Sequence, residues 1–287
     1  MDDDARALTL EPDRSSRHSA GIHASPAEVY EAITDPRALS RWFLSEASID
    51  LRPGGAYRWV FGDATGTSGP DAHVASGEFV AIAPQEAVRM KSRVRDLDTD
   101  LEFRLDPWRD GTVLTVTHGG FPGDESWDET FRAIDEGWES EVQVLKFYME
   151  KARGMIRRSQ FHEIRIAAPV EEAYLRFTTQ AGICSWLAGR AAADPSPGGE
   201  FLLEWEGRSA IRGRFAVANS ERLLVMTWEG DKPSVVRIWF EEDDEGRASI
   251  ISLEHRLFAP DRDGFEPWRW DEALARLAEA VRGGPPA

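Results

Sequence analysis

Cysteine, basic charge and long apolar runs are scarce in this sequence of 287 residues, and each shortage excludes a class of protein. The single cysteine, Cys184, excludes an intramolecular disulfide framework and is typical of a reducing compartment. We interpret it as a packing residue beside Trp186. No apolar run approaches the roughly 20 residues of a membrane span, and the acidic start Met1-Asp2-Asp3-Asp4 differs from a secretory signal. We therefore expect a cytoplasmic protein that does not insert into a membrane.

The charge balance is strongly acidic. Asp and Glu number 51 against 34 Lys and Arg, which gives a formal net charge of −17 at pH 7. Nucleic acids and anionic lipid surfaces are repelled at long range by such a charge, so we expect neither as a partner. The length predicts about two domains on the usual prior of roughly 100–200 residues each.

Motifs for a metal, a cofactor or a catalytic nucleophile are also missing. His18 and His23 lie five positions apart on a predicted strand, hence on opposite faces, and no Cys or His cluster has zinc spacing. Residues 62–69 are rich in glycine but lack the lysine and the strand–helix context of a phosphate-binding loop. We expect no metal and no cofactor, and we assign no catalytic residue.

The main positive feature is a repeat. Trp42 lies near the end of a helical segment and is followed by the turn Pro53-Gly54-Gly55 and an aromatic strand. The same order returns 144 positions later with Trp186 and the turn Pro197-Gly198-Gly199. Because helix, turn and strand recur in register, we infer a tandem duplication.

Each half is predicted to contain a strand, two short helices, five further strands joined by hairpins, and a long C-terminal helix. Ser25 followed by Pro26 is typical of a helix start. Tyr57, Trp59 and Phe61 alternate with polar positions, as on the buried face of a strand. A mostly antiparallel sheet with its helices on one face defines the α+β class.

The sequence also predicts where the units begin and end. Residues 1–16 are polar without periodicity, so we expect a disordered lead-in there. A first domain is expected at residues 17–156 and a second at residues 157–287, because a basic linker occupies residues 153–159. Within the first domain, residues 62–76 are rich in Gly, Ser, Thr and Asp and predict a long loop.

A fixed order of motifs runs through the first half. Its members are Ile22, the run Val29-Tyr30-Glu31-Ala32-Ile33-Thr34-Asp35-Pro36, Trp42-Phe43, Gly54-Gly55, Gly77-Glu78-Phe79, residues 111–118, Gly120-Phe121-Pro122 and Gly137-Trp138. In these motifs the chain resembles the START-like (SRPBCC) superfamily. Within it, the chain is most similar to the family named for the C-terminal domain of the activator of the heat-shock-protein-90 ATPase. The second half departs where His255-Arg256-Leu257-Phe258 replaces the family's His-x-Gly-Phe.

This resemblance, which covers residues 17–153 and 161–282, implies a fold and a range of functions. The fold is a tandem pair of helix-grip domains, in each of which a curved antiparallel sheet wraps around a long C-terminal helix. Superfamily members bind lipids, sterols, hormones or polyketides in a cavity between sheet and helix, and a minority catalyse cyclisation or aromatisation. A ligand site is therefore expected on the inner face of the sheet.

Residues with aromatic or large side chains on that face, together with one histidine per half, are the candidate ligand-binding residues. They are Trp42, Tyr57, Trp59, Phe61, Phe79, Met90, Phe103, His118, Trp138, Trp186, Phe201, Trp205, Phe215, His255 and Trp270. Aromatic residues in such positions also form ordinary cores. His118 and His255 can either donate a hydrogen bond to a ligand or be satisfied by neighbouring protein atoms.

Three functions fit these features. The leading hypothesis is a non-catalytic protein that binds a small apolar or amphipathic molecule. The first alternative is a cyclase-like or aromatase-like enzyme acting on a hydrophobic substrate. The second is a co-chaperone or stress adaptor that contacts a protein partner through Trp108, at a predicted hairpin tip, or Trp127, in a predicted loop. Because the first half keeps the fuller family pattern, we expect it to be the binding half if only one binds.

Overall fold

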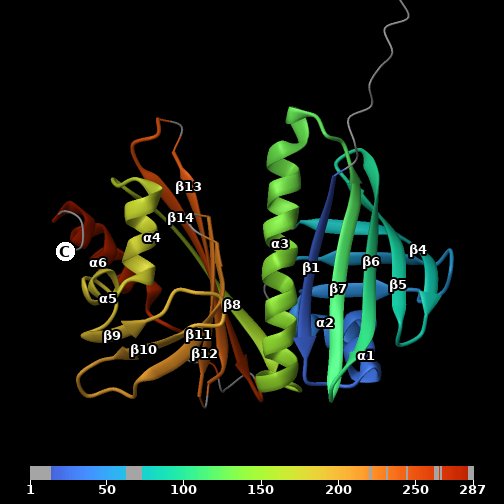
Figure 1. The fold of residues 1–287 in the computed structure, drawn as a ribbon, viewed down its shortest axis with the longest axis horizontal. Helices are drawn as coiled ribbons and strands as arrows, with labels where there is room; N and C mark the ends of the chain where they lie inside the picture. Colours follow the sequence, from blue (N-terminus) through green and yellow to red (C-terminus); the bar gives the residue numbers. More distant parts are fainter. Residues whose placement is uncertain are drawn as a thin grey trace, which may run out of the picture.

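The computed structural model describes residues 14–62, 73–219, 222–230, 232–243, 245–261, 265 and 267–283. Two seven-stranded antiparallel sheets dominate it (Figure 1). We name them sheet A, with the strand order β1-β7-β6-β5-β4-β3-β2, and sheet B, with the order β8-β14-β13-β12-β11-β10-β9. The two orders are the same, so the repeat found in the sequence is also a repeat of topology. The α+β class is confirmed.

The elements of the first half are β1 (Arg14–Ile22), α1 (Pro26–Thr34), α2 (Pro36–Trp42), β2 (Glu46–Ile49), β3 (Ala56–Val60), β4 (Val74–Ala83), β5 (Ala87–Val94), β6 (Leu97–Trp108), β7 (Gly111–Phe121), η1 (Glu125–Trp127), α3 (Asp128–Phe147) and η2 (Tyr148–Ala152). Those of the second half are β8 (Ile156–Ile166), α4 (Val170–Thr178), α5 (Gln180–Cys184), β9 (Arg190–Ala193), β10 (Glu200–Glu204), β11 (Ile211–Asn219), β12 (Leu223–Glu229), β13 (Ser234–Glu242), β14 (Ser249–Ala259) and α6 (Trp270–Arg282).

Several boundaries differ from those predicted. Strand β1 begins at Arg14, so residues 14–16 are part of sheet A and not of a disordered lead-in. Residues 1–13 lie outside the described residues, as do residues 63–72 of the predicted loop, whose last residues belong to β4. Strands β2 and β9 were missed because each has only four residues at a sheet edge and no alternating apolar pattern.

The repeated tryptophan fixes the corner between the short helices and the sheet. Trp42 donates its indole N–H to the carbonyl of Ala32 at 2.9 Å, and Trp186 donates to the carbonyl of Arg176 at the same distance. Both indoles are buried, and each bond ties the end of the second short helix to the first. Ser25 caps α1 in a capping box with Glu28, as the start signal predicted. The Trp motif is therefore an architectural feature.

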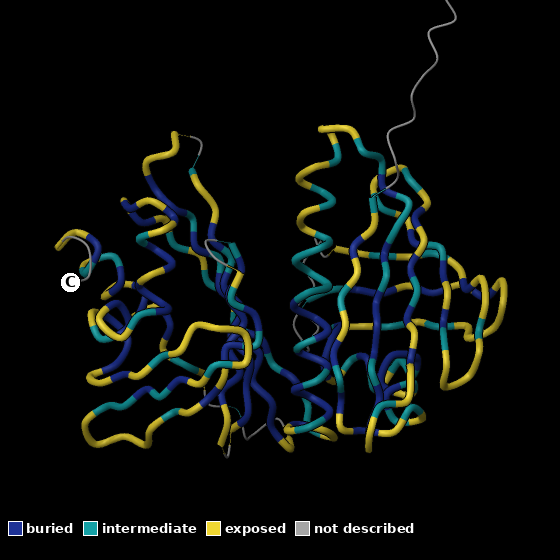
Figure 2. Tube along the Cα trace, viewed as in Figure 1, coloured by how far each residue is buried: buried dark blue, intermediate teal, exposed yellow. Residues whose placement is uncertain are grey.

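Helix α3 lies between the two sheets (Figure 1). One of its sides packs on sheet A, while β11, β12 and β13 of sheet B approach the other. Apolar residues of sheet B, among them Val225 and Val235, belong to the same buried cluster as the core of the first half. The middle strands of sheet B are consequently buried on both faces (Figure 2). Helices α4, α5 and α6 cover the far side of sheet B.

A buried ionic cluster between α3 and sheet B joins the two halves. Glu141 of α3 accepts hydrogen bonds from Arg237 of β13 at 2.6 Å and from Arg256 of β14 at 2.7 and 2.8 Å. Glu254 of β14 also pairs with both arginines. Burial raises the pKa of Glu141, but the attraction of Arg237 and Arg256 outweighs it and holds the pKa below its usual range. Both carboxylates therefore stay ionised inside the protein.

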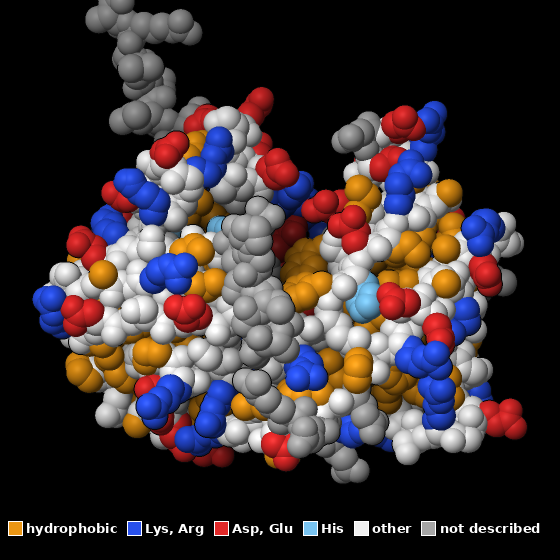
Figure 3. Space-filling view, turned by 180° about the vertical axis from the view of Figure 1, so that it is seen from behind, with side chains coloured by type: hydrophobic (Ala, Val, Ile, Leu, Met, Phe, Trp, Pro, Cys, Tyr) orange, Lys and Arg blue, Asp and Glu red, His pale blue; other side chains and the backbone are white. Residues whose placement is uncertain are grey.

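A notch opens between the two halves at the upper end of the molecule, as the space-filling view from behind shows (Figure 3). Among the described residues, no helix is long and apolar enough to cross a membrane.

Candidate ligand-binding site

A cavity of about 1110 Å³ opens between sheet B and helix α6. Its walls come from the segment after α5, the β10–β11 and β12–β13 connections, strand β14 and the N-terminal part of α6. The lining residues are Cys184, Ser185, Trp186, Leu187, Ala188, Gly189, Trp205, Glu206, Arg208, Ser209, Ala210, Ile211, Trp228, Glu229, Gly230, Lys232, Ser234, His255, Leu257, Pro267, Trp268, Arg269, Glu272 and Arg276.

Tryptophan rings form one wall of this cavity. The ring of Trp268 lies 5.4 Å from that of Trp205 and 5.1 Å from that of Trp228, measured between centroids. Trp270 lies behind them, 5.9 Å from Trp228, and is almost completely buried. Such spacings are typical of interacting aromatic pairs. The wall offers flat apolar surface to whatever enters the cavity.

Two tethers hold the tryptophans of this wall in place. Trp205 donates its indole N–H to the carbonyl of Leu187 at 2.7 Å, which links β10 to the segment after α5. The side-chain amide of Gln160 on β8 bonds both to the carbonyl of Trp268 at 3.0 Å and to its backbone N–H at 2.9 Å. Trp268 is thereby fixed to sheet B.

His255 borders the same cavity and is 2% exposed. The indole N–H of Trp270 donates to Nδ1 of His255 at 3.0 Å, so the ring carries its own proton on Nε2. Among the described residues, neither this Nε2 nor the indole nitrogen of Trp228 has a hydrogen-bond partner. Burial lowers the pKa of His255 to about 3, so the imidazole is neutral at pH 7. An unpaired buried donor of this kind costs about 1–3 kcal/mol.

His118 is the equivalent histidine of the first half, and both its nitrogens are paired. Trp138 donates to its Nδ1 at 3.0 Å, and its Nε2 lies 2.8 Å from the hydroxyl of Thr99. That hydroxyl donates in turn to the carbonyl of Ser92 at 2.7 Å. Burial lowers the pKa of His118 to about 4. His118 is thus a satisfied core histidine.

The rim of the cavity is charged but not acidic. Four basic side chains face three acidic ones there, although the whole chain carries a net charge of −17. Arg276 donates from Nε to the carbonyl of Trp186 at 2.9 Å, and Arg269 pairs with Glu272 within α6 and its N-terminal flank. The mouth therefore does not repel an anionic group in the way that the rest of the surface does.

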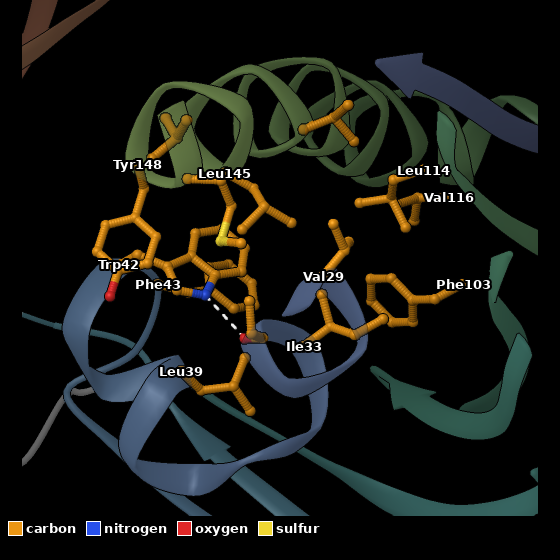
Figure 4. Close-up of a cluster of buried hydrophobic side chains, with 14 of the residues drawn as sticks. Val29, Ile33, Leu39, Trp42, Phe43, Phe103, Leu114, Val116, Leu145 and Tyr148 are labelled. Atoms are coloured by element: carbon orange, nitrogen blue, oxygen red, sulfur yellow. Dashed lines mark hydrogen bonds between the residues drawn. The ribbon is translucent and has the colours of Figure 1, made fainter. Parts of the chain in front are cut away.

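The candidates of the first half lie together in a packed core. Trp42, Tyr57, Trp59, Phe79, Met90, Phe103 and His118 are buried, while Phe61 and Trp138 are half-buried against them. Side chains from α1, α2 and α3 fill the interior, as Figure 4 shows for part of this cluster. Burial raises the pKa of the Tyr57 hydroxyl to about 12. The hollows that border this half are smaller, about 330 to 390 Å³, and lie beside α1 and α2 or against the second half.

The candidates of the second half divide into two groups. Trp186, Trp205 and His255 line the cavity, whereas Phe201, Phe215 and Trp270 are buried in the core behind it. The sequence favoured the first half as the binding half, but the large cavity lies in the second. The shape of the interior depends on how side chains fill it, which the motif pattern does not report.

Sequence reasoning missed Trp228 and Trp268 as cavity residues. Trp228 lies on β12, and Trp268 lies in the connection before α6. The run Pro267-Trp268-Arg269-Trp270 was the available signal for Trp268, because it places a second tryptophan two positions before the one that begins the helix.

Trp108 and Trp127 are less exposed than the sequence suggested. Trp108 covers the backbone of Gly21 and lies under the guanidinium of Arg109, 4.7 Å from the ring centroid. Trp127 packs near Phe121 with Arg95 over its ring at 4.7 Å. Both indoles are half-buried within the first half.

Comparison with solved structures finds several similar chains at low identity. DynU16, from the dynemicin biosynthetic locus, is 20% identical, with 94% of this chain and 95% of that chain covered and a TM-score of 0.42. The di-domain ARO/CYC protein BexL of the BE-7585A biosynthetic pathway is 17% identical, with coverages of 94% and 92% and a TM-score of 0.40. The Aha1 dimer of Colwellia psychrerythraea is 20% identical, with 48% of this chain and 96% of that chain covered and a TM-score of 0.40.

Family membership is decided at the level of sequence. None of the curated proteins matches the chain. The family model described as Activator of Hsp90 ATPase homolog 1-like protein matches twice, at residues 23–150 and at residues 167–282, and so covers most of both halves. The chain belongs to the Activator of Hsp90 ATPase homolog 1-like family and contains two tandem copies of its domain.

Proposed function

We propose that the cavity of the second half binds a small, flat, amphipathic molecule with an aromatic body. The single observation that carries this proposal is the wall formed by Trp205, Trp228 and Trp268 along a cavity of about 1110 Å³. That volume is large enough for a drug-sized ligand, since such sites commonly measure about 300–1,000 Å³. Burial of about 200 Å² of ligand surface contributes roughly 5 kcal/mol before the costs of association.

The charged rim extends the proposal to one end of the ligand. An aromatic body stacks along the tryptophans, and an acidic or otherwise polar end remains at the mouth near Arg208 and Arg276. A net acidic protein with a non-acidic mouth favours anionic over cationic ligands at this place. The relatives BexL and DynU16 come from biosynthetic loci, and we take from them only that aromatic metabolites are reasonable ligands to test.

A cyclase-like activity has less support from the same site. General base catalysis works best with a group whose pKa lies near the operating pH. His255 has a pKa of about 3, so at pH 7 it is a weak base, although its Nε2–H remains a good hydrogen-bond donor. His118, the other candidate base, is buried and paired on both nitrogens. We therefore propose a binding protein in preference to an enzyme.

A chaperone contact also has less support. It relied on Trp108 and Trp127 as exposed anchors, and both are half-buried against their own domain.

Titration with 1-anilinonaphthalene-8-sulfonate tests the proposal, because this probe combines a fluorescent aromatic body with one anionic group. We expect saturable binding and quenching of tryptophan fluorescence, with an affinity at least tenfold lower in Trp268→Ala. Trp127→Ala is the matched control, since it removes a half-buried tryptophan far from the cavity, and it should bind as the wild type does. Absence of saturable binding, or equal loss in both variants, would refute the proposal.

A further inference from the structure

His255 and His118 occupy equivalent places and receive the same hydrogen bond. His118 lies on β7 and His255 on β14, which are the last strands of their halves in chain order. Each histidine accepts at Nδ1 a hydrogen bond from the tryptophan of the following helix, at 3.0 Å. That donor fixes the tautomer, so Nε2 carries the proton in both rings. The two halves therefore each contain one buried imidazole whose Nε2–H requires an acceptor.

The first half provides the acceptor from its own chain. His118 donates to the hydroxyl of Thr99, which in turn donates a hydrogen bond to the backbone carbonyl of Ser92. The strand register identifies the equivalent positions in the second half. Leu101 pairs with His118 as Val236 pairs with His255, so Ser234 stands in place of Thr99.

A second replacement changes the side chain on the neighbouring strand. Thr99 pairs with Ser92 on β5, whereas Ser234 pairs with Trp228 on β12. The small serine is thus exchanged for a tryptophan that is itself a donor. Among the described residues, neither Nε2 of His255 nor Nε1 of Trp228 finds an acceptor, and the two rings lie 4.9 Å apart. Both residues line the same cavity, and native proteins seldom leave buried donors unpaired.

We propose that His255 is a specificity-determining residue whose Nε2–H, aided by Trp228, binds an oxygen acceptor on the ligand, such as the carbonyl of a quinone or an aryl ketone. The inference rests on the proposed function and deepens it. The tryptophan wall selects a flat aromatic body, and the two donors select one edge of it that carries oxygen. A plain hydrocarbon of the same outline leaves both donors unpaired and binds less well.

The test compares two soluble probes that differ only in the acceptors. Anthraquinone-2-sulfonate has two carbonyl oxygens on the central ring, and anthracene-2-sulfonate has none. By calorimetric titration we expect the quinone to bind the wild-type protein about tenfold more tightly. In His255→Phe this preference should fall to about twofold or less, with the affinity for anthracene-2-sulfonate little changed. His118→Phe is the matched control from the first half and should keep the preference.

A measurement on the wild-type protein guards against variants that do not fold. With ¹⁵N-labelled histidine, the Nε2 and Hε2 resonances of His255 should shift on addition of the quinone and remain nearly constant with anthracene-2-sulfonate. Equal affinity for both probes with an unshifted Nε2 resonance would overturn this inference and leave the proposed function standing. Binding of neither probe would remove the proposed function and this inference together. If the quinone shifted the Nε2 resonance but bound no more tightly than anthracene-2-sulfonate, it would only replace a water that accepts from Nε2. That result would overturn the inference as well.

Discussion

His118 and His255 are equivalent residues of the two halves whose Nε2 atoms have different surroundings. The tryptophan donor, the strand position and the loss of charge by burial are shared by the two. The surroundings of Nε2 differ, since Ser234 stands in place of Thr99 and Trp228 in place of Ser92. Nε2 of His118 is paired with Thr99, whereas Nε2 of His255 has no partner among the described residues and His255 borders the cavity.

These histidines predict a specific pH dependence of stability. Their pKa values in the folded state are about 4 and about 3, below the value of about 6.5 expected in the unfolded chain. The unfolded state therefore binds more protons, so the stabilising contribution is fully present above pH 6.5 and declines as the pH falls. Between about pH 6 and pH 4.5 the free energy of unfolding should decrease by up to about 1.4 kcal/mol per pH unit for each histidine.

Urea unfolding at half-unit pH intervals, followed by circular dichroism, measures this slope. In His118→Phe the slope should fall by up to about 1.4 kcal/mol per pH unit, because one histidine with a lowered pKa no longer titrates. His23, which is exposed near Asp110, supplies the matched control, and His23→Phe should keep the full slope. A wild-type stability that is flat over this pH range would show that neither histidine is held neutral by the fold.

At the scale of elements, the Gly-Gly turn before β3 combines two different demands. Gly54 has a φ of +75°, a conformation that glycine adopts without strain, whereas a Cβ on Gly55 would stand 2.0 Å from the carbonyl oxygen of Asp50. Gly198 and Gly199 repeat both features at the start of β10. The turn is repeated because the backbone geometry of this corner admits no side chain at its second glycine.

Gly55→Ala should therefore destabilise the protein by about 3 kcal/mol, in the upper range for a single substitution, since backbone must move to remove the overlap. Gly137→Ala is the matched control. Gly137 lies inside α3, where an added Cβ meets nothing within 4 Å, and the higher helix propensity of alanine should stabilise the protein by up to about 1 kcal/mol. Chemical denaturation at pH 7 distinguishes the two signs. Similar effects of both substitutions would show that backbone crowding does not govern this turn.

Elements with a strong periodic pattern could be predicted from the sequence, and those without it could not. The alternation of Tyr57 and Trp59 placed β3 on the inner face, and Ser25 with Pro26 placed the start of α1. Strands β2 and β9 are held by pairing with β3 and β10, so their own residues carry little signal. Local pattern reports what a segment buries by itself, and an edge strand buries little.

The candidate site could be predicted only as a face of the sheet. The aromatic residues of both halves were recognised, but whether they enclose a cavity depends on the size of the side chains opposite them. In the first half Phe43 stacks on Trp42 and lies edge-on to Trp59. In the second half Leu187 takes the place of Phe43 at the equivalent position and borders the cavity. Such differences in filling are not visible in the hydrophobic pattern, because both residues read simply as apolar.

For the whole molecule, the unexpected feature is that the middle strands of sheet B are buried on both faces. Arg237, Glu254 and Arg256 alternate with apolar residues and therefore look like the solvated face of an antiparallel strand. In the structure α3 covers that face, and Glu141 supplies the countercharge. Packing between two halves of one chain is a long-range property, and a period-two pattern in one strand carries no information about it.

Removal of the Glu141 carboxylate should show how much the buried ionic cluster contributes to the free energy of unfolding. Glu141→Gln leaves Arg237 and Arg256 without one of their two acidic partners in a buried site, and loss of one member of such a network costs about 3–5 kcal/mol. Urea unfolding at pH 7, followed by both tryptophan fluorescence and circular dichroism, should show this loss as a lower midpoint. Glu129→Gln, an exposed position on the same helix, should change the stability by less than about 0.5 kcal/mol. If Glu141→Gln were as stable as Glu129→Gln, the halves would be held together by the other contacts of α3, among them its apolar contacts and the ion pair of Glu136 with Arg222, and the ionic cluster would not contribute to stability.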